Sequence, residues 1–345
     1  MKMVQQAKAN TGWLQKLVPN FINQKILVIG DLILDRYIYG AVSRISPEAP
    51  VPVVQVTNEK NMPGGAANVA RNVRSLGGNV VLSGIVGQDQ SGRDLLSILS
   101  DEGIATDGVM SLPQLRTTVK TRILAEHQQV VRVDRDDPVS LPADMLSEFC
   151  RIAADAVSHV SGVIIEDYAK GTVQQEVVDV VLAAAKKQGV LIAFDPKENS
   201  NLKIDGISVA TPNRKETFVL ACLPEMSTPD DPLKDKALLR AADILLEQWT
   251  PDFLIVTLGS HGMLLISKNQ KPCRVHTVAQ EVFDVSGAGD TVVAAALLAL
   301  CAGADHNQAA ELANCAAGVV VGKVGTATCT VKELEKCGSD LNGKL

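Results

Sequence analysis

The stretch DVSGAGDTVVAAALLALCAG (residues 284–303) places two glycines and an acid directly ahead of a long apolar segment. Glycine accepts backbone conformations that other residues avoid, so consecutive N–H groups around Ala288 can converge on one point. The positive end of the following helix lies there too, which predicts an anion hole at Gly287, Ala288 and Gly289. Asp290 would repel a resting phosphate, so its position makes sense if it faces a neutral hydroxyl that is about to lose its proton. The alternative is an ordinary strand-to-helix turn in which Asp290 caps the helix.

Composition and charge restrict the class of protein. The chain has 345 residues, of which 46% are hydrophobic and 21% charged, as is typical of a soluble globular protein. A formal net charge of −6 and 3% aromatic residues argue against a nucleic-acid backbone as the main partner. Seven cysteines without a C-x-x-C pair favour reduced thiols. The apolar run at 292–302 is too short to span a bilayer and the N-terminus lacks an apolar signal segment, so we expect a cytoplasmic protein.

Short apolar runs alternate with helical patterns along most of the chain. Strands are expected at 25–30, 80–87, 162–166, 190–195, 206–211 and 253–258, and helices at 66–76, 91–102, 143–158, 173–188, 233–248 and 305–322. Strands that are apolar along their length and alternate with helices predict a parallel sheet covered on both faces. The stretches 50–57 and 116–134 instead alternate apolar and polar residues, which predicts a small separate sheet with one solvated face.

Three further turns follow predicted strands or open predicted helices. TLGSHGM (257–263) suits a turn that contacts a nucleotide, or it is an ordinary β-turn. In TPNRKE (211–216), Glu216 is placed to hold metal-bound water near phosphates, or it completes a capping box. PGGAANVARNVRSLG (63–77) opens a helix whose Asn68 offers donors and acceptors to sugar hydroxyls; alternatively, its glycines serve only close helix packing.

Two of these motifs resemble a known family. DVSGAGDT resembles the D-T-x-G-A-G-D signature of the ribokinase or PfkB family of carbohydrate kinases, and PGGAANVARN resembles its N-terminal glycine signature. The similarity extends from Lys25 to about Thr330. It implies a ribokinase-like three-layer α/β/α sandwich with a mostly parallel sheet and a small β-sheet lid, with ATP, Mg²⁺ and the monovalent cation K⁺ as ligands. The expected organisation is an N-terminal extension (1–24), a kinase domain (25–335) with lid strands at about 36–60 and 115–135, and a C-terminal tail (336–345).

The resemblance also implies roles for individual residues, with Asp290 as the catalytic base and the 287–289 turn as the site of the γ-phosphate. The residues expected on the ATP side are Asn213, Glu216, Thr257, Gly259, Gly262 and Asn314. Those expected to contact the sugar are Asp35, Gly64, Gly65, Asn68 and Asp167. Those expected around the monovalent cation are Asp284, Ser286, Val320 and Gly325.

Basic side chains of the small sheet are candidates for a phosphate on the substrate. Lys120 and Arg122 share one face of their stretch, and Arg132 and the loop residue Arg44 lie nearby in the pattern. A guanidinium's planar fork suits a phosphate group, so we expect one or more of these residues to bind the sugar's distal phosphate; the alternative is a solvated strand face. Two lysines are rival phosphate ligands, the second on the ATP side, or else surface residues: Lys170 and Lys197.

The acceptor is also suggested by resemblance. Within the family, GDLILDRY, SRISPEAPVPVV, EDYAKG and FDPK are most similar to kinases that phosphorylate O1 of D-glycero-β-D-manno-heptose 7-phosphate in the ADP-heptose pathway. The alternatives are a kinase for fructose 1-phosphate or tagatose 6-phosphate, and a non-catalytic sugar- or nucleotide-binding module. No H-x-G-H motif is present, so we expect no fused adenylyltransferase activity. Lids of the family often pair between subunits, which predicts a homodimer with contacts at Val51, Val53 and Ile123.

Overall fold

The computed structural model describes residues 12–343 apart from 126–127, 227–228 and 280. Within this part of the chain, the larger sheet has nine strands in the order β13-β12-β11-β10-β9-β8-β1-β4-β5. Neighbours from β11 to β5 run parallel, and β12 and β13 are added antiparallel at one edge. The strands are β1 (Lys25–Gly30), β4 (Asn79–Gly87), β5 (Ala105–Leu112), β8 (Gly162–Glu166), β9 (Leu191–Asp195), β10 (Val209–Ala210), β11 (Phe253–Thr257), β12 (Met263–Ile266) and β13 (Cys273–Val275).

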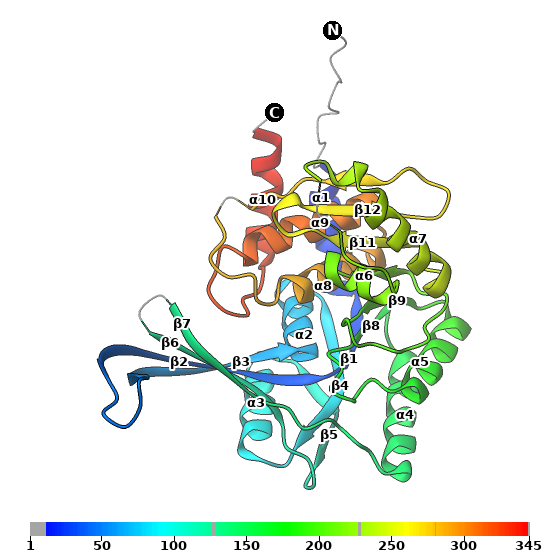
Figure 1. Ribbon diagram of the computed structural model, residues 1–345. Coiled ribbons are helices and arrows are strands. Elements are labelled where there is room, and N and C mark those ends of the chain that lie inside the picture. The colour runs from blue at the N-terminus through cyan, green and yellow to red at the C-terminus, as the bar shows by residue number, and fades with distance from the viewer. Residues whose placement is uncertain (1–11, 126–127, 227–228, 280, 344–345) are drawn as a thin grey trace.

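Helices cover both faces of this sheet, as Figure 1 shows. Successive side chains of a strand point to opposite faces, so β1 contributes Ile26 and Val28 to one hydrophobic cluster and Leu27 and Ile29 to the other. The first cluster contains residues of α1 (Gly12–Leu17), α2 (Ala66–Ser75), α3 (Gln90–Asp101), α8 (Ala288–Cys301), α9 (His306–Val320) and α10 (Val331–Gly343). The second contains residues of α4 (Ala143–Val157), α5 (Gln175–Gln188), α6 (Arg214–Leu220) and α7 (Lys236–Trp249). The described residues also form three short 3₁₀ helices: η1 (Val18–Asn23), η2 (Pro232–Lys234) and η3 (Gly259–His261).

Helix α8 lies at the centre of the first helical layer. Its residues 290–299 are all buried, and it packs against α2, α9 and β9. A helix that is apolar around its whole circumference has to be enclosed by other elements. The stretch 284–303 therefore contains a rigid central helix, α8, whose first turn lies at the carboxyl edge of the sheet.

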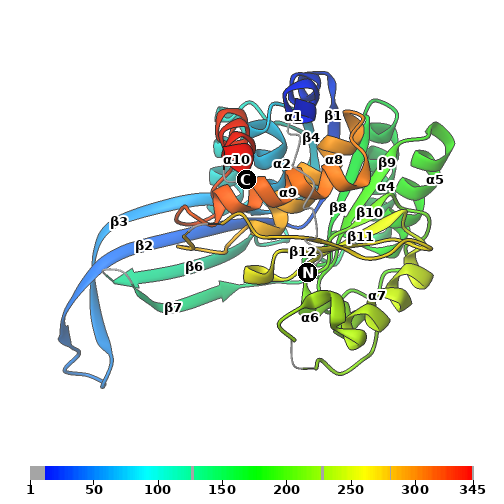
Figure 2. The same ribbon diagram turned by 90° about the horizontal axis from the view of Figure 1, so that it is seen from above.

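A second sheet of four strands projects from the main body, which is clearest in Figure 2. We call it the lid. Its order is β3-β2-β6-β7, in which only β2 and β6 run parallel. The inner ends of β2 and β3 are buried, whereas residues 41–45 of β2 are exposed. The lid strands are β2 (Leu32–Ile45), β3 (Pro52–Gly65), β6 (Thr118–Ala125) and β7 (Gln128–Arg135).

The predicted fold class is confirmed, but β5, β12, β13, α1 and α10 were not among the predicted elements, and several element ends differ. The strand expected at 206–211 is reduced to the two residues of β10, and β2 starts at Leu32, ahead of the lid boundary expected at 36. Residues 12–23, from the expected extension, bury Leu14 and Phe21 in the core, and α10 runs across the expected boundary at 335. Among the described residues, no helix is both long and apolar enough to cross a membrane.

Candidate active site

Three parallel strands end side by side at the carboxyl edge of the large sheet. The register aligns Gly30 at the end of β1 with Glu166 at the end of β8, and Glu166 with Asp195 at the end of β9. A Cβ atom on Gly30 would lie 2.1 Å from the Glu166 carbonyl oxygen, so only glycine fits there. Carboxyl ends of parallel strands are where α/β folds form their binding crevices. Two buried acids are thereby brought next to the first turn of α8.

Asp290 lies on that first turn and its side chain is buried, with 3% of the residue exposed. One carboxylate oxygen accepts a hydrogen bond from Asn68 Nδ2 at 2.7 Å, and the other accepts one from the Tyr168 hydroxyl at 2.8 Å. Burial raises the pKa of Asp290 above its usual value, while the hydrogen bonds from Asn68 and Tyr168 act in the opposite direction. A carboxylate with a raised pKa and fixed orientation is suited to accept a proton.

A buried polar network fixes α8 against α2. The Thr291 hydroxyl donates to Asn72 Oδ1 at 2.9 Å, and Asn72 Nδ2 donates to the Asn68 carbonyl at 2.9 Å. Gly287, the N-cap of α8, has φ +77°, and a Cβ atom there would lie 2.6 Å from Asn68 Nδ2. The predicted anion-hole turn is therefore packed against the side chain that holds Asp290. The Ala288 amide donates to the Val285 carbonyl at 3.2 Å, so a phosphate would compete with this bond.

The carboxylates of Glu166, Asp195 and Asp290 form a buried acidic cluster in which the potential ligand atoms lie within 4.8 Å of one another. Both oxygens of Glu166 are buried without a hydrogen-bond partner among the described residues. Burial, followed by the charges of Asp195 and Asp290, raises the pKa of Glu166 well above its usual value. Burial, opposed by Lys197, raises the pKa of Asp195 to about 7. The cluster thus has negative charge that a proton or a cation can neutralise.

Asn213 and Glu216 form the capping box that the sequence analysis gave as the alternative to a metal role. Asn213 Oδ1 accepts from the Glu216 amide at 2.9 Å, and Glu216 Oε2 accepts from the Asn213 amide at 2.8 Å. The second Glu216 oxygen faces Lys197 Nζ at 3.5 Å, and the Glu216 charge contributes to the raised pKa of Asp195. Glu216 therefore caps α6 and also borders the acidic cluster.

A cavity of about 480 Å³ lies beside the first turn of α8. Its walls are mostly apolar, with Val282, Val285 and Val321 among them. Asn314 lines it as well, although its amide donates to the His276 carbonyl at 2.7 Å and so ties α9 to the loop before α8. A preformed apolar cavity with a few polar groups is the usual form of a small-molecule site. The residues from the sequence analysis that line it are Thr257, Gly259, Gly262, Ala288, Gly289 and Asn314.

The inner end of the lid lies on the other side of Asp290. Asp35 on β2 is buried and forms an ion pair with Arg122 of β6, and the register pairs Asp35 with Lys120. A Cβ atom on Gly64 would lie 2.2 Å from Asp35 Oδ2, and Gly65 has φ +56°. The two glycines therefore let the end of β3 approach Asp35 and turn into α2, which carries Asn68.

The remaining basic candidates are not gathered at Asp290. Arg44 is exposed and lies nine residues beyond Asp35 on β2, roughly 30 Å along the strand. Arg132 lies opposite Arg122 in the register of β6 and β7, but it is paired with Asp134 and half its side chain is exposed. Lys170 Nζ donates to Asp136 at 2.6 Å. Asp167, expected to contact the sugar, is buried. Its carboxylate accepts from the Ala169 amide at 2.8 Å and so stabilises the loop to which it belongs.

The segment expected around a monovalent cation joins two loops. Asp284 accepts from the Ser286 amide at 2.9 Å and from the Gly325 amide at 3.0 Å. The Val320 carbonyl accepts from the Lys323 amide at 2.9 Å. Asp284 thus holds residues 283–286 against 320–325, immediately before the glycine turn of α8.

Three residues of the site were missed by the sequence reasoning: Glu166, Asp195 and Tyr168. Glu166 and Asp195 each end a short buried strand, which was a usable signal, since an acid at the carboxyl end of a parallel strand faces the crevice. Nothing local to the sequence places Tyr168 against Asp290, because 122 residues separate them.

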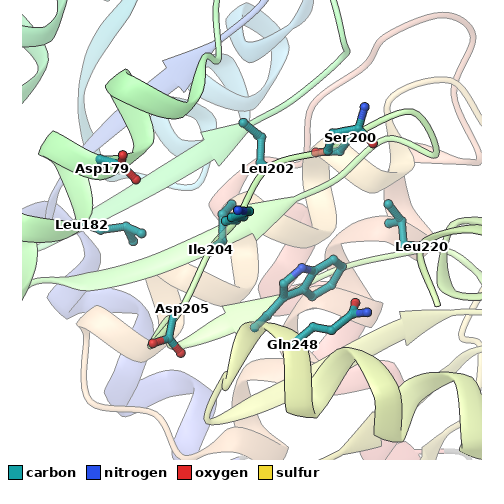
Figure 3. Close-up of a pocket in the computed structure, with 11 residues that line it drawn as sticks. Asp179, Leu182, Ser200, Leu202, Ile204, Asp205, Leu220 and Gln248 are labelled. Atoms are coloured by element: carbon teal, nitrogen blue, oxygen red, sulfur yellow. The ribbon is translucent and has the colours of Figure 1, made fainter. Parts of the chain in front are cut away.

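A second cavity, of about 580 Å³, lies on the outer side between α5, α7 and the segment 200–205 (Figure 3). Trp249, Leu202 and Ile204 are among its lining residues. It includes none of the residues that the sequence analysis singled out, and no glycine turn opens onto it. The larger cavity is therefore not the candidate active site.

A buried acid on the first turn of a central helix, between a nucleotide-sized cavity and a lid, defines the class as a phosphotransferase acting on sugars. Residues 23–333 match the family described as "pfkB family carbohydrate kinase", and the chain belongs to that family. It is 43% identical over 329 residues to the "Bifunctional protein HldE" of Caulobacter vibrioides, and 41% identical over 323 residues to that of Vibrio vulnificus strain YJ016. These matches cover 94% and 93% of this chain and 65% of each relative, so the chain spans less than two thirds of their length.

Solved structures agree on the fold. An Arabidopsis thaliana ribokinase "complexed with Ribose and ATP" superimposes with a TM-score of 0.70 at 21% identity, covering 91% of this chain and 98% of that one. Escherichia coli phosphofructokinase-2 "in complex with Potassium" gives 0.72 at 24% identity, covering 92% and 98%. At these identities the comparison establishes the ribokinase-like architecture alone.

Proposed function

We propose that this sugar kinase transfers the γ-phosphate of ATP to O1 of D-glycero-β-D-manno-heptose 7-phosphate and yields the 1,7-bisphosphate, a step of the ADP-heptose pathway that supplies the lipopolysaccharide core. The observation that carries the proposal is the position of Asp290. Asp290 directly follows Ala288 and Gly289, which line the cavity of about 480 Å³ together with the 257–262 turn, and its carboxylate accepts from Asn68, three residues after the end of lid strand β3. The similarity of EDYAKG and FDPK to heptose 7-phosphate kinases supports the choice of acceptor.

In the proposed reaction, the acceptor hydroxyl approaches the terminal phosphate at the 287–289 turn. The bond between O1 and the γ-phosphorus forms as the bond from that phosphorus to the β–γ bridging oxygen breaks, and ADP leaves. Asp290 takes the O1 proton late in the transfer, because the transition state is loose and needs only a modest base. The first-turn amides of α8 stabilise the charge on the phosphoryl oxygens.

The acidic cluster fits a divalent cation such as Mg²⁺. The fit rests on Glu166, whose two buried oxygens have no partner among the described side chains, and on the carboxylate chemistry of the cluster. Glu166 and Asp195 would hold the ion, with Glu216 beside them acting through water. When bound, Mg²⁺ would neutralise charge on the phosphates. The resemblance also implies K⁺ at the Asp284 segment, where the Asp284 carboxylate already accepts from the Ser286 and Gly325 amides, so K⁺ would have to share these oxygens.

Lys120 is the best-placed group for the sugar's distal phosphate. It belongs to the lid, its ammonium nitrogen lies 5.0 Å from the Tyr168 ring centroid, and burial lowers its pKa although the Asp35 charge opposes this. Lys170 is already paired with Asp136 at 2.6 Å, so a phosphate would have to compete with that ion pair. Arg122 is already neutralised by Asp35, so we assign it to orienting that carboxylate toward the sugar hydroxyls.

We further propose a homodimer formed through the lid. Apolar side chains of the lid are exposed, among them Ile45 (61%) and Val51 (51%) at its outer end and Val133 (54%) on its edge strand β7. Val53 and Ile123, the other expected contacts, are half-buried within the subunit. Exposed apolar strands of this kind are commonly covered by another chain.

The experiment that tests the proposal is a panel of sugar phosphates incubated with ATP and Mg²⁺, with the product position read by phosphorus NMR. Heptose 7-phosphate should be phosphorylated at O1 with a kcat/KM at least tenfold above fructose 1-phosphate and tagatose 6-phosphate. Preferred turnover of either hexose phosphate would replace the acceptor and keep the kinase. Absence of sugar-dependent ATP consumption with every member of the panel would indicate a binding module.

A further inference from the structure

Tyr168 connects the candidate base to the loop that follows β8. Its hydroxyl donates to Asp290 Oδ1 at 2.8 Å, while Asn68 holds the other oxygen of the same carboxylate. Each Asp290 oxygen therefore has one fixed donor and keeps a lone pair for a further hydrogen bond. With both oxygens tied, the carboxylate cannot rotate without breaking a bond.

The backbone of this tyrosine is fixed by a buried acid. Asp31, with 1% of its surface exposed, accepts from the amides of Tyr168 (2.9 Å), Lys170 (3.0 Å) and Thr172 (3.0 Å). The next residue, Ala169, has φ +54°, a left-handed conformation that is unfavourable for alanine and persists only where its surroundings impose it. The loop is therefore built to one conformation.

Cations fix the ring of Tyr168. Lys197 Nζ lies 4.3 Å from the ring centroid and Lys120 Nζ lies 5.0 Å from it. Attraction between an ammonium group and an aromatic face favours both contacts. Lys120 belongs to the lid and Lys197 follows β9, so the ring meets the two sides of the site.

We propose that Tyr168 is a positioning residue that orients the Asp290 carboxylate toward the acceptor hydroxyl. The inference rests on the proposed function, in which Asp290 is the base. In this role Tyr168 transfers no proton: its hydroxyl donates to Asp290 Oδ1 and holds that oxygen in place.

The test replaces only the hydroxyl, with Tyr168→Phe, and keeps the ring on which the lysines lie. We expect kcat to fall about 10-fold, with KM for ATP unchanged, because one hydrogen bond to a charged group is lost. The melting temperature and KM for the sugar phosphate should stay close to the wild type, because the lost bond acts on the Asp290 carboxylate and the ring stays in place. A purely structural role would instead lower the melting temperature and raise both KM values together with the loss of rate.

Two variants measured in parallel separate the possible outcomes. Tyr39→Phe removes a lid phenol that stacks on Tyr37, and it should leave both kcat and the melting temperature unchanged. Asp290→Asn tests the proposed function itself. If Asp290→Asn is inactive while Tyr168→Phe keeps the wild-type kcat, or loses kcat only together with melting temperature and both KM values, the inference about Tyr168 is overturned and the base remains. If Asp290→Asn retains near-normal transfer, Asp290 is not the base, and the proposed function is contradicted whatever Tyr168→Phe shows.

Discussion

The two sides of Asp290 are built differently. On the nucleotide side, the cavity is bounded by the first turn of α8, by α9 and by the turn after β11, and α8 is buried over ten consecutive residues. On the lid side, the inner ends of β2, β3 and β6 are buried, whereas the outer half of β3 and all of β7 are exposed. The ion pair of Arg122 with Asp35 links β6 to β2 there. Folding alone therefore forms the nucleotide side and the base, whereas the acceptor side depends on a few charged contacts.

This contrast predicts that variants on the two sides of Asp290 change different kinetic constants. Changes at the first turn of α8 should reduce kcat, because the core fixes the geometry there and cannot adapt. Changes in the lid should alter KM for the sugar phosphate, since they affect contacts that the acceptor completes.

Asp290→Asn should break the transfer step and leave the nucleotide side intact. The amide keeps the shape of the side chain but cannot accept the proton, so we expect kcat to fall by about 10³-fold. ATP affinity, measured by calorimetry, should stay within threefold of the wild type. Near-normal turnover would remove Asp290 from the role of base.

Gly287→Ala should disturb the same turn through Asn68. The new Cβ atom would lie 2.6 Å from Asn68 Nδ2, at a φ of +77° that disfavours alanine. We expect kcat to fall by about 100-fold, because Asp290 loses its aligned hydrogen bond. Gly303→Ala is the matched control: it has φ +97° but no heavy atom within 4 Å of the added Cβ. It should lower the melting temperature and leave kcat unchanged, and an equal loss of kcat in both variants would contradict the account.

Arg122→Ala tests whether the lid side determines the KM for the sugar phosphate. Removing the partner of buried Asp35 should raise KM for the sugar phosphate about 10-fold or more, while KM for ATP changes little. Arg132→Ala removes the arginine opposite Arg122 on β7; because it is already paired with Asp134 and half exposed, steady-state kinetics should show less than a twofold change. Equal effects of the two variants would mean that Arg132 contacts the acceptor as well.

The pH dependence of stability should report the acidic cluster. The pKa of Asp195 is raised from 3.8 to about 7, so its contribution to stability is fully present below pH 3.8 and is lost as pH rises through 7. Asp195→Asn removes this loss and should raise the melting temperature at pH 8, in EDTA, by about 3 °C. The exposed Asp155→Asn should leave the melting profile unchanged. A destabilised Asp195→Asn protein at pH 8 would contradict the assignment of a charge penalty to this cluster.

Much of the fold follows from local patterns. The range 162–166 predicted for a buried strand is that of β8, and the helices expected at 66–76 and 143–158 differ from α2 and α4 by a single residue at their ends. Apolar periodicity and glycine turns are sufficient there, because each element is specified within its own segment. The strand predicted at 206–211 is too long, because an apolar run does not show how many of its residues pair with a neighbouring strand.

The site was less predictable because it depends on register and neighbourhood. Asp290 and Asn68 lie in recognisable motifs, but Glu166 and Asp195 meet only because β8 and β9 are adjacent and aligned. Arg44 and Arg122 appear equivalent as basic lid residues, yet the pairing of β2 with β6 places Arg122 by Asp35 and leaves Arg44 at the exposed end. Which strands become neighbours is a tertiary property that a local pattern does not contain.

The most direct test of the central claim is a crystal structure of the protein with a non-hydrolysable ATP analogue, Mg²⁺ and heptose 7-phosphate. The account predicts that the terminal phosphate contacts the 287–289 turn and that O1 of the sugar lies within about 3 Å of an Asp290 oxygen. A nucleotide bound outside the cavity beside α8, or an acceptor hydroxyl that does not reach Asp290, would contradict it.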